Sequence, residues 1–321
     1  MDYFNSQIKI KDRFFPRFIG GPLDGITDAP FRKLVRDFSK DELLYTEMRH
    51  VRSIVTPKGG ALALDFAQFE RPLNFQVSAN SVEFIEQACE KILQAGVDAI
   101  DLNVGCPASN VISSCSGSAL MANPAMLEKI LKEFKRVLPD HVIFTIKIRA
   151  GFKEVNAVDI AKLAQDCGVD ALAIHPRLAK QMFTGQPDYK VAAAVKQALQ
   201  IPVIFSGNVV NFKTAKMTYD MTGVDGFLIG RGMWAKPWKL EEMKQHALGN
   251  DYTVDSKMIL KVALRHLSLM MEAYGMHGLL RFRKHLPFYI KGHPSASALR
   301  QRLVVSHNET DVKEGLQEFL G

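Results

Sequence analysis

Short apolar runs separated by amphipathic stretches dominate the chain up to about residue 238. Short apolar runs bounded by turn residues are typical of buried strands. The expected strands are residues 17–20, 43–46, 73–77, 99–102, 142–147, 171–175, 202–206 and 226–230. Helical periodicity occupies several of the intervening stretches, at residues 81–94, 124–138, 158–167 and 190–199.

The boundaries of the helices carry recognisable residues. Ser81 with Glu83, and Asn123 with Pro124, predict helix starts. A Gly-Val-Asp sequence recurs at 96–98, 168–170 and 223–225, where each glycine is expected to close a helix before the next strand. Strands that alternate with helices in this way predict a parallel (β/α)8 TIM barrel. A doubly wound open sheet is the alternative, but no Gly-x-Gly-x-x-Gly sequence follows the first strand.

The pattern changes after Trp238, and only helical periodicity follows. One apolar face is formed by Ile259, Leu260, Ala263, Leu264, Leu267, Met270 and Met271. Gly275, Gly278 and Gly292-His293-Pro294 are expected to divide this region into three or four helices. We therefore expect a barrel catalytic domain at residues 1–249 and a small C-terminal all-helical domain at residues 250–321.

The composition of the chain is typical of a globular protein and argues against a membrane protein. The chain is 47% hydrophobic and 23% charged, which is ordinary for a globular protein. No apolar run approaches the roughly 18 residues of a membrane span, and the first residues do not resemble a signal peptide. The cysteines show no Cys-x-x-Cys spacing, so we expect no zinc site. These features predict a cytoplasmic protein with reduced cysteines and no membrane partner.

The net charge of +7 is unevenly distributed. Between residues 276 and 306 there are no acidic residues and six cations: Arg281, Arg283, Lys284, Lys291, Arg300 and Arg302. His277, His285 and His293 lie in the same window. Such a run indicates either a polyanion partner such as nucleic acid or a solvated basic helix face, and charge alone does not separate the two.

A cysteine lies on a shaped loop after the fourth expected strand. That strand is expected to stop at Asn103, and Gly105-Cys106-Pro107 then forces a turn. Gly105 would supply backbone angles closed to other residues, and Pro107 restricts its own φ and the conformation of Cys106. In an α/β barrel this places the thiol on the catalytic face, whereas a cysteine used only for packing more often lies inside an element.

Other polar residues fall at or just past expected strand ends: Gln76, Lys147, His175 and Asn208. Strand ends converge on one pocket in a barrel, so we expect these side chains to meet Cys106 there. The glycine-containing loops at 206–208 and 229–232 follow the last two strands, where this fold commonly binds a phosphate, and Arg231 would add a cationic contact. Lys147 would stabilise an anionic reduced flavin, and a single phosphate site favours FMN.

The loop Asn103-Val104-Gly105-Cys106-Pro107, together with Gly117-Ser118-Ala119-Leu120, closely resembles the signature of the tRNA-dihydrouridine synthases, especially the bacterial B-type branch. The similarity covers nearly the whole chain. Further matching segments are 21–28, 46–48, 75–77, 146–149, 175–177, 201–207, 229–232 and 283–285. This sequence departs from the family pattern at Leu23, Asp24, Pro176, Leu178 and Ser206-Gly207-Asn208.

The resemblance implies a tightly bound FMN that takes hydride from NADPH or NADH and reduces the C5–C6 bond of specific uridines in tRNA. It assigns FMN binding to Pro22, Leu23, Asp24, Gln76, Lys147, His175, Ser206, Gly207, Asn208, Gly230 and Arg231. It makes Cys106 the proton donor, and a thiol that is largely protonated near neutral pH suits that role. It assigns RNA contacts to Asn103, Arg149, Arg281, Arg283 and Lys284.

Two other functions compete with this one. An FMN-dependent reductase of small pyrimidines or enones, similar to the dihydroorotate dehydrogenases, would use the same barrel but would not need the basic helical region. An RNA-binding protein without catalysis would not need Cys106 and Lys147. We expect the enzyme to act as a monomer, with no obligate protein partner.

Overall fold

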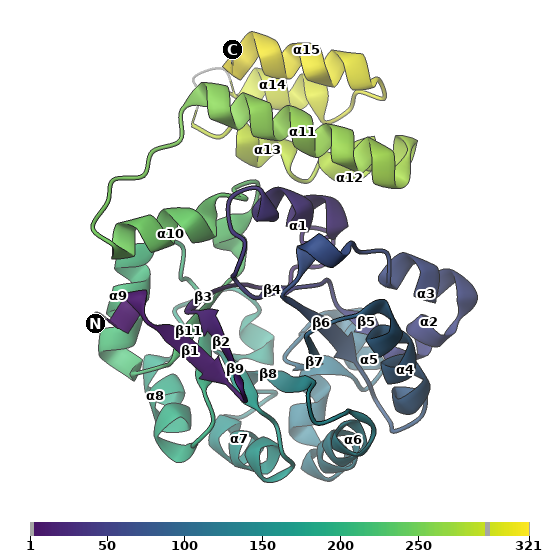
Figure 1. The fold of residues 1–321 in the computed structure, drawn as a ribbon, viewed down its shortest axis with the longest axis vertical. Coiled ribbons are helices and arrows are strands. Elements are labelled where there is room, and N and C mark those ends of the chain that lie inside the picture. Colours follow the sequence, from purple (N-terminus) through teal and green to yellow (C-terminus); the bar gives the residue numbers. More distant parts are fainter. Residues whose placement is uncertain (1–2, 293–295, 321) are drawn as a thin grey trace.

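Eight parallel strands form a closed barrel in the computed structural model, which describes residues 3–292 and 296–320 (Figure 1). They are β3 Phe18–Gly20, β4 Leu44–Tyr45, β6 Leu73–Ser78, β7 Ala99–Val104, β8 Ile143–Gly151, β9 Ala171–Leu178, β10 Val203–Ser206 and β11 Gly226–Ile229. The pairing of β4 with β6 closes the ring. Every expected strand is therefore present, and the predicted TIM barrel is confirmed.

Helices surround this barrel, as the amphipathic stretches predicted (Figure 1). They are α1 Ala29–Arg36, α2 Val51–Val55, α3 Pro57–Ala63, α4 Ile85–Ala95, α5 Ser109–Ser113, α6 Pro124–Val137, α7 Ala157–Asp166, α8 Tyr189–Ala198, α9 Phe212–Thr222 and α10 Lys239–Ala247. Short 3-10 turns are η1 Tyr3–Asn5, η2 Gln68–Glu70, η3 Gly117–Ala122, η4 Ala179–Gln181 and η5 Arg231–Met233.

The two predicted helix starts differ in outcome. Asn123 caps α6, and its side chain accepts the Met126 N–H at 3.1 Å. The start predicted at Ser81 is wrong, because α4 begins only at Ile85. Phe84 holds a left-handed φ of +66° just before it, which interrupts the helical backbone.

A β-hairpin that the sequence analysis missed closes one end of the barrel. Its strands are β1 Gln7–Ile10 and β2 Arg13–Pro16. Ile8, Ile10 and Phe15 are buried against barrel-interior side chains near the starts of the strands, including Ala99 and Ile143. The alternating burial of β1 is the usual pattern of a half-buried strand, so the signal was present in a segment too short to stand out. A further short strand, β5 Arg49–His50, pairs in parallel with the end of β6 and was also missed.

The three Gly-Val-Asp turns fix the register of the barrel strands. Their glycines hold left-handed φ values of +86°, +84° and +66°, as predicted. Each aspartate then accepts, at 2.8 Å, the backbone N–H of a residue near the start of the preceding strand: Asp98 from Leu73, Asp170 from Phe144 and Asp225 from Val203. Cations lie beside all three: Arg13 and Arg71 at Asp98, Lys11 at Asp170, and Lys196 at Asp225. Alternate strand pairs are thus clamped at the same end of the barrel.

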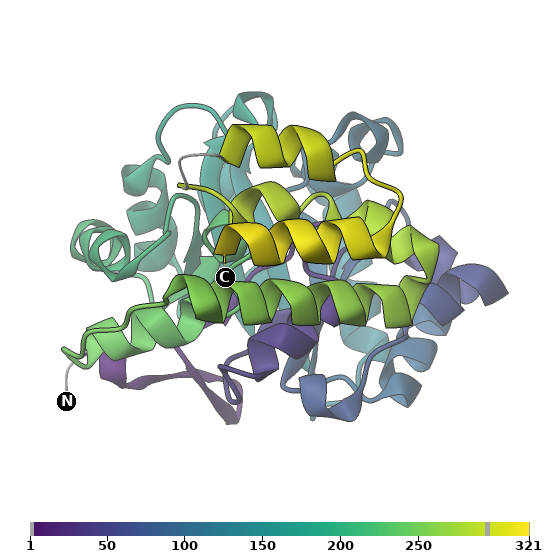
Figure 2. The ribbon, with the colours of Figure 1, turned by 90° about the horizontal axis from the view of Figure 1, so that it is seen from above.

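Within residues 250–292 and 296–320, five helices follow the barrel rather than the expected three or four: α11 Ser256–Tyr274, α12 Met276–Phe282, α13 Leu286–Tyr289, α14 Ala296–Leu303 and α15 Glu309–Leu320. Figures 1 and 2 show them gathered on one side of the barrel. They share an apolar cluster that also includes Ala235 and Trp238. Gly275 ends α11 as predicted, but Gly278 lies inside α12. A Cβ at Gly278 would overlap the Met270 carbonyl oxygen, so this glycine allows close helix packing rather than a break. His293 and Pro294 lie outside the described residues.

In residues 3–292 and 296–320, none of the helices combines the length and apolar character that crossing a bilayer requires.

We predict that Asp98→Ala lowers the free energy of unfolding by about 2 kcal/mol at pH 7, because the Leu73 N–H loses its buried acceptor. Burial alone would raise the pKa of Asp98, but hydrogen bonds from Arg71, Leu73 and Arg13 outweigh burial and hold it below its ordinary 3.8. Asp98 therefore stabilises the fold above about pH 4, and this contribution is lost as the pH falls further. Urea unfolding at pH 7 and at pH 3 measures both effects.

Asp220→Ala is the control. Asp220 forms an exposed pair with Lys216 at 3.1 Å, one turn away on α9, so its loss should change stability by no more than about 0.5 kcal/mol. Equal losses from the two substitutions would contradict the role given to Asp98.

Candidate active site

One cavity of about 850 Å³ lies at the carboxyl ends of the barrel strands. Every residue that the sequence analysis placed in the site lines it, except Arg281 and Arg283. The lining residues among those predicted are Pro22, Leu23, Asp24, Gln76, Asn103, Cys106, Lys147, Arg149, His175, Ser206, Gly207, Asn208, Gly230, Arg231 and Lys284. The expected convergence of strand ends on one pocket is confirmed, while the roles of the individual residues stay predictions.

Several of these residues lie inside strands rather than past their ends. β7 continues to Val104, so the expectation that it stops at Asn103 is wrong. β8 and β9 likewise extend beyond Lys147 and His175. The last residues of these strands face a cavity rather than an apolar core, so polar side chains are found there. The apolar run in the sequence, from which each strand was predicted, therefore ends before the strand does.

A chain of hydrogen bonds connects a buried carboxylate to the Cys106 loop. Asp101 accepts the Thr145 hydroxyl at 2.6 Å and the Gln76 amide at 2.8 Å. The side-chain oxygen Oε1 of Gln76 accepts a hydrogen bond from the side-chain nitrogen Nδ2 of Asn103 at 2.9 Å. The side-chain oxygen Oδ1 of Asn103 accepts the backbone N–H of Cys106 at 2.8 Å. The side chain of Asn103 therefore shapes the turn that presents the thiol.

Two further contacts hold the Cys106 loop. The Gly105 carbonyl accepts Arg149 Nε at 2.7 Å, and the Cys106 carbonyl accepts the Ser118 N–H at 3.0 Å. Gly105 is not among the glycines with positive φ, so the expectation of unusual backbone angles there is wrong. A Cβ at Gly105 would lie 3.2 Å from the Ile148 carbonyl carbon, and the residue is needed for this close approach to β8. Cys106 is half-buried, whereas Cys115 is exposed.

Arg149 is only 2% exposed, and it links two loops. Besides Gly105, it donates to the carbonyls of Leu178 at 3.1 Å and Met182 at 2.9 Å. Burial lowers its pKa to about 10. These three bonds use Nε and one terminal nitrogen, so the second terminal nitrogen keeps its donors.

Lys147 is a partly buried cation that lines the cavity. In the described part of the chain it has no hydrogen-bond partner and no ion pair. Burial, followed by the repulsion of Arg149, lowers its pKa to about 8, and the attraction of Asp101 opposes this shift. A desolvated ammonium group without a partner attracts an anionic or electron-rich group in the cavity.

His175 is neutral in this environment. Burial and the neighbouring cations Lys147, Arg149 and Arg177 lower its pKa to about 2. Arg177 lies 2.8 Å from His175 Nε2, and because a guanidinium only donates, the ring proton resides on Nδ1. His175 thus lines the cavity as a neutral side chain rather than as a second positive charge.

Arg177 was missed as a functional residue, although it lies within the segment that carries the family resemblance. It is 1% exposed, and it donates to the carbonyls of Thr184 at 3.1 Å and Gly185 at 2.6 Å. It also donates to Asn208 Oδ1 at 3.2 Å. A charged residue two positions after His175 on the same strand was the available signal.

The loops after β10 and β11 meet at Asn208. Its Oδ1 accepts from Arg231 at 3.3 Å as well as from Arg177. Gly207 and Asn208 both have positive φ, at +125° and +56°. A Cβ at Gly207 would lie 3.0 Å from the His175 ring, so glycine keeps this corner open. Arg231 is exposed, and its guanidinium lies over the ring of Phe183, 4.9 Å from the ring centroid. Phe183 also lines the cavity and is a second residue that the sequence did not predict.

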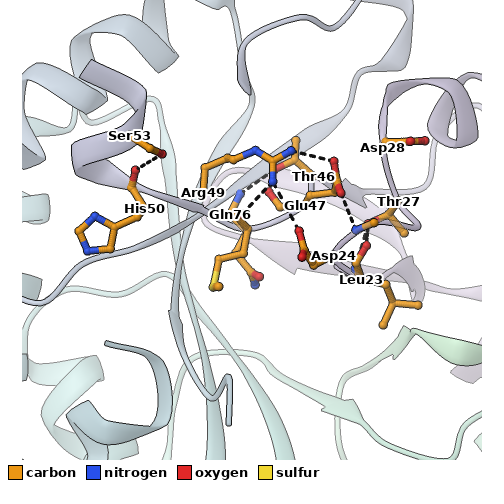
Figure 3. A network of polar contacts seen from close by, with 12 residues as sticks. Leu23, Asp24, Thr27, Asp28, Thr46, Glu47, Arg49, His50, Ser53 and Gln76 are labelled. Carbon is orange, nitrogen blue, oxygen red and sulfur yellow. Dashed lines mark hydrogen bonds and ion pairs between the residues drawn. The ribbon is translucent and has the colours of Figure 1, made fainter. Parts of the chain in front are cut away.

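Figure 3 shows the polar network around the loop after β3. Glu47 accepts the Gly25 N–H at 2.6 Å and Arg49 at 2.9 Å. The Asp24 side chain is 78% exposed and lies 3.5 Å from Arg49. Although Asp24 lines the cavity, its carboxylate is solvated and has a cation beside it, which limits its repulsion of an anionic ligand.

The basic run is not one free cationic face. Arg281 lies 3.4 Å from Asp28 and 3.7 Å from Glu47, and Arg283 donates to the Ser306 carbonyl at 2.6 Å. His285 is fully buried. Lys284 is the member of the run that lines the cavity, and its ammonium group reaches Gly25. The acidic partners of Arg281 lie more than 200 positions away along the chain, so counting charges in a window could not find them.

Comparison with known proteins decides the family. The family model described as dihydrouridine synthase (Dus) matches residues 19–320. The chain belongs to the Dus family. It is 34% identical to tRNA-dihydrouridine synthase B of Xanthomonas campestris pv. campestris, over 92% of this chain and 89% of that protein. It is 33% identical to tRNA-dihydrouridine synthase B of Vibrio parahaemolyticus, over 88% of this chain and 89% of that protein.

The fold of this Dus protein extends to more distant enzymes. The structure of histamine dehydrogenase from Rhizobium sp. 4-9 superimposes with a TM-score of 0.61 at 10% identity, over 84% of this chain and 51% of that chain. At this level of identity the likeness shows a shared fold and nothing further.

We predict that Gly117→Ala damages the Cys106 loop. Gly117 has a φ of +58°, and a Cβ there would lie 2.8 Å from the Cys106 carbonyl oxygen. The left-handed backbone costs about 1 kcal/mol and the collision about 1–3 kcal/mol more. Displacement of the thiol should lower dihydrouridine formation by up to about 100-fold. Urea unfolding and product assays measure the two effects.

Gly223→Ala provides the matched control. Its φ is +66°, but nothing lies within 4 Å of the added Cβ. It should lose about 1 kcal/mol and keep its activity. If both variants lose the same stability and both remain active, the contact between Gly117 and Cys106 has no functional importance.

Proposed function

We propose that this Dus protein reduces the C5–C6 bond of uridines in tRNA, with tightly bound FMN and with NADPH or NADH as the hydride donor. The observation that carries the proposal is the presence in one cavity of a loop-held thiol, Cys106, and a partly buried cation, Lys147, that has no ion pair within the described residues. Relatives named tRNA-dihydrouridine synthase B support tRNA as the substrate.

The residues of the cavity fit FMN. Backbone groups of Gly207 and Gly230, with the Arg231 side chain, suit a phosphate at the loops after β10 and β11. Lys147 suits the electron-rich edge of a flavin ring, and neutral His175 offers a donor from Nδ1 without adding charge. The remaining contacts are assigned to Pro22, Leu23, Asp24, Gln76, Ser206 and Asn208, which line the same cavity. When bound, FMN supplies the hydride for C6 of the uracil.

Within this scheme, Cys106 donates the proton that C5 of the uracil requires. The thiol is half-buried, so it can face a substrate in the cavity, and its loop is fixed by Asn103, Arg149 and Ser118. Lys147 keeps positive charge close to the place where negative charge develops during the reduction. The mostly apolar walls of the cavity limit access of water to the reacting atoms.

Asn103 and Arg149 are proposed to contact the target nucleotide. Each already has partners within the chain, but each also keeps free donors on a terminal nitrogen. The same residues would therefore hold the catalytic loop and recognise a base carbonyl. A nucleotide contact and a positioning contact are compatible here because they use different atoms.

We further propose that residues 1–249 act as the catalytic unit and residues 250–321 bind RNA, with NAD(P)H entering the barrel cavity. Lys284, Lys291 and Arg300 are exposed and available for phosphates. Arg281 and Arg283 would contribute indirectly, because they already bind acidic or carbonyl groups of the protein. One chain supplies every proposed site residue, so a monomer would be active.

Cys106→Ala should separate the two halves of the reaction. The variant should retain FMN and accept hydride from NADPH at nearly the wild-type rate, because those steps need only the cofactor residues. Loss of a positioned general acid typically lowers a rate by roughly 10²–10⁴-fold, so tRNA should gain almost no dihydrouridine. Flavin absorbance follows the first half, and nucleoside mass spectrometry follows the second.

Cys115→Ala is the control for this experiment, because Cys115 is exposed and does not line the cavity. It should make product at the wild-type rate. A Cys106→Ala enzyme with normal product formation, or a Cys115→Ala enzyme without any, would show that the acid is misassigned.

A further inference from the structure

Asp101 is a buried carboxylate that contacts the cavity-lining residue Gln76, and none of the roles above requires it. It is fully buried, and neighbouring Gln76 and Thr145 are each 1% exposed. No Lys, Arg or His lies within ion-pair distance of it in the described part of the chain. A buried carboxylate without a salt bridge is costly, so a neutral residue at this position would make the fold more stable.

The hydrogen bonds around Asp101 have a single consistent direction. At one end, the backbone N–H groups of Gly105 and Cys106 can only donate, so Asn103 must present its oxygen to them, at 3.1 and 2.8 Å. The Asn103 nitrogen must then donate to Gln76 Oε1 at 2.9 Å. The Gln76 nitrogen in turn points at Asp101, at 2.8 Å, and finds an acceptor there only if that oxygen carries no proton.

The second carboxylate oxygen has a hydroxyl donor. The Thr145 hydroxyl oxygen accepts the Asn74 amide at 2.9 Å, so its proton is free to point at Asp101, at 2.6 Å. Both oxygens of Asp101 therefore receive donors from side chains that are themselves oriented. An ionised carboxylate is the group that accepts from both sides.

We propose that Asp101 is a positioning residue: its carboxylate orients the amides of Gln76 and Asn103, and through them holds the backbone of Cys106 in the geometry needed for proton transfer. This inference rests on the function proposed above. A second effect of the same charge is to support the cationic form of Lys147.

The charge of Asp101 depends on pH in the range where the enzyme is assayed. The titratable side chains that face it are Lys147 on β8 and Tyr45 on β4. Burial raises the pKa of Asp101 to about 6, against the lowering effects of Thr145, Gln76 and Lys147. A raised carboxyl pKa means that ionisation costs stability in full above about pH 6, that this cost declines as the pH falls from about 6, and that it is gone below the ordinary carboxyl pKa of 3.8. Activity should have the opposite trend, because the amide chain needs the ionised form.

Asp101→Asn tests the proposal, since the new side chain has the same size but no charge. It should be more stable than wild type in urea at pH 8, and this difference should shrink at pH 5. Hydrogen exchange at the amides of Gly105 and Cys106 should become at least about tenfold faster. Hydride uptake from NADPH should persist, while transfer to tRNA uridine should fall by about 10–100-fold and lose its dependence on a group titrating near pH 6.

Asp28→Asn is the matched control. Asp28 is also buried, at 1% exposed, and burial followed by the repulsion of Glu47 raises its pKa to about 6, but its partners are the Phe31 N–H and Arg281 rather than the amide chain of Gln76 and Asn103. It should share the pH-dependent change in stability and leave exchange at Gly105 and Cys106 unchanged.

Unchanged exchange at these two amides in Asp101→Asn, or wild-type transfer to uridine, would overturn the positioning role. A failure of the proposed function is distinct from this. If the wild-type protein makes no dihydrouridine but Asp101→Asn still loosens the Cys106 loop, the structural inference stands and the substrate is wrong.

Discussion

The register of the barrel strands is the constraint on which the site depends. Side chains alternate between the two faces of a strand, so a slip of one residue would turn every cavity residue outward. Register pairs Gln76 with Asp101, Asn103 with Lys147, and Arg149 with His175 across neighbouring strands. The aspartate clamps at Asp98, Asp170 and Asp225 secure this alignment from the opposite end of the barrel. Stability is thus concentrated at one end of the strands, and chemistry at the other.

Positive charge predominates around the cavity. Four cations lie close enough to His175 to lower its pKa: Lys147, Arg149, Arg177 and Arg231. Asp101 is a fully buried carboxylate in the same part of the barrel. Arg149 and Arg177 donate mainly to carbonyl oxygens of the protein, so both hold loops in place, and Arg149 keeps one terminal nitrogen without such a bond. Lys147 has no such partner, and its charge is available to a ligand. Arg149 thus combines a loop contact with a place in the cavity lining, whereas Lys147 lines the cavity without a partner among the described residues.

Much of the barrel and the position of the site could be predicted, because both follow from local patterns. Apolar runs mark the strands, and polar residues at their ends mark the cavity. The missed features depend on contacts between distant parts of the chain. Arg281 was expected to be available for RNA, but it is paired with Asp28 and Glu47. Gly278 was expected to break a helix, but it allows two helices to pack closely. The direction of the amide chain from Asp101 to Cys106 also required coordinates, since it crosses from β7 to Gln76 on β6 and back.

The most direct test of the account is whether the purified protein converts uridine in tRNA. Unmodified tRNA transcripts are incubated with the protein and NADPH, digested, and examined by nucleoside mass spectrometry, with free uridine and small pyrimidines as parallel substrates. The account predicts that uridines at defined positions of tRNA gain two hydrogen atoms and that the free compounds react far more slowly. Reduction of the flavin by NADPH with no dihydrouridine in any transcript, or with preferred reduction of a free pyrimidine, would contradict it.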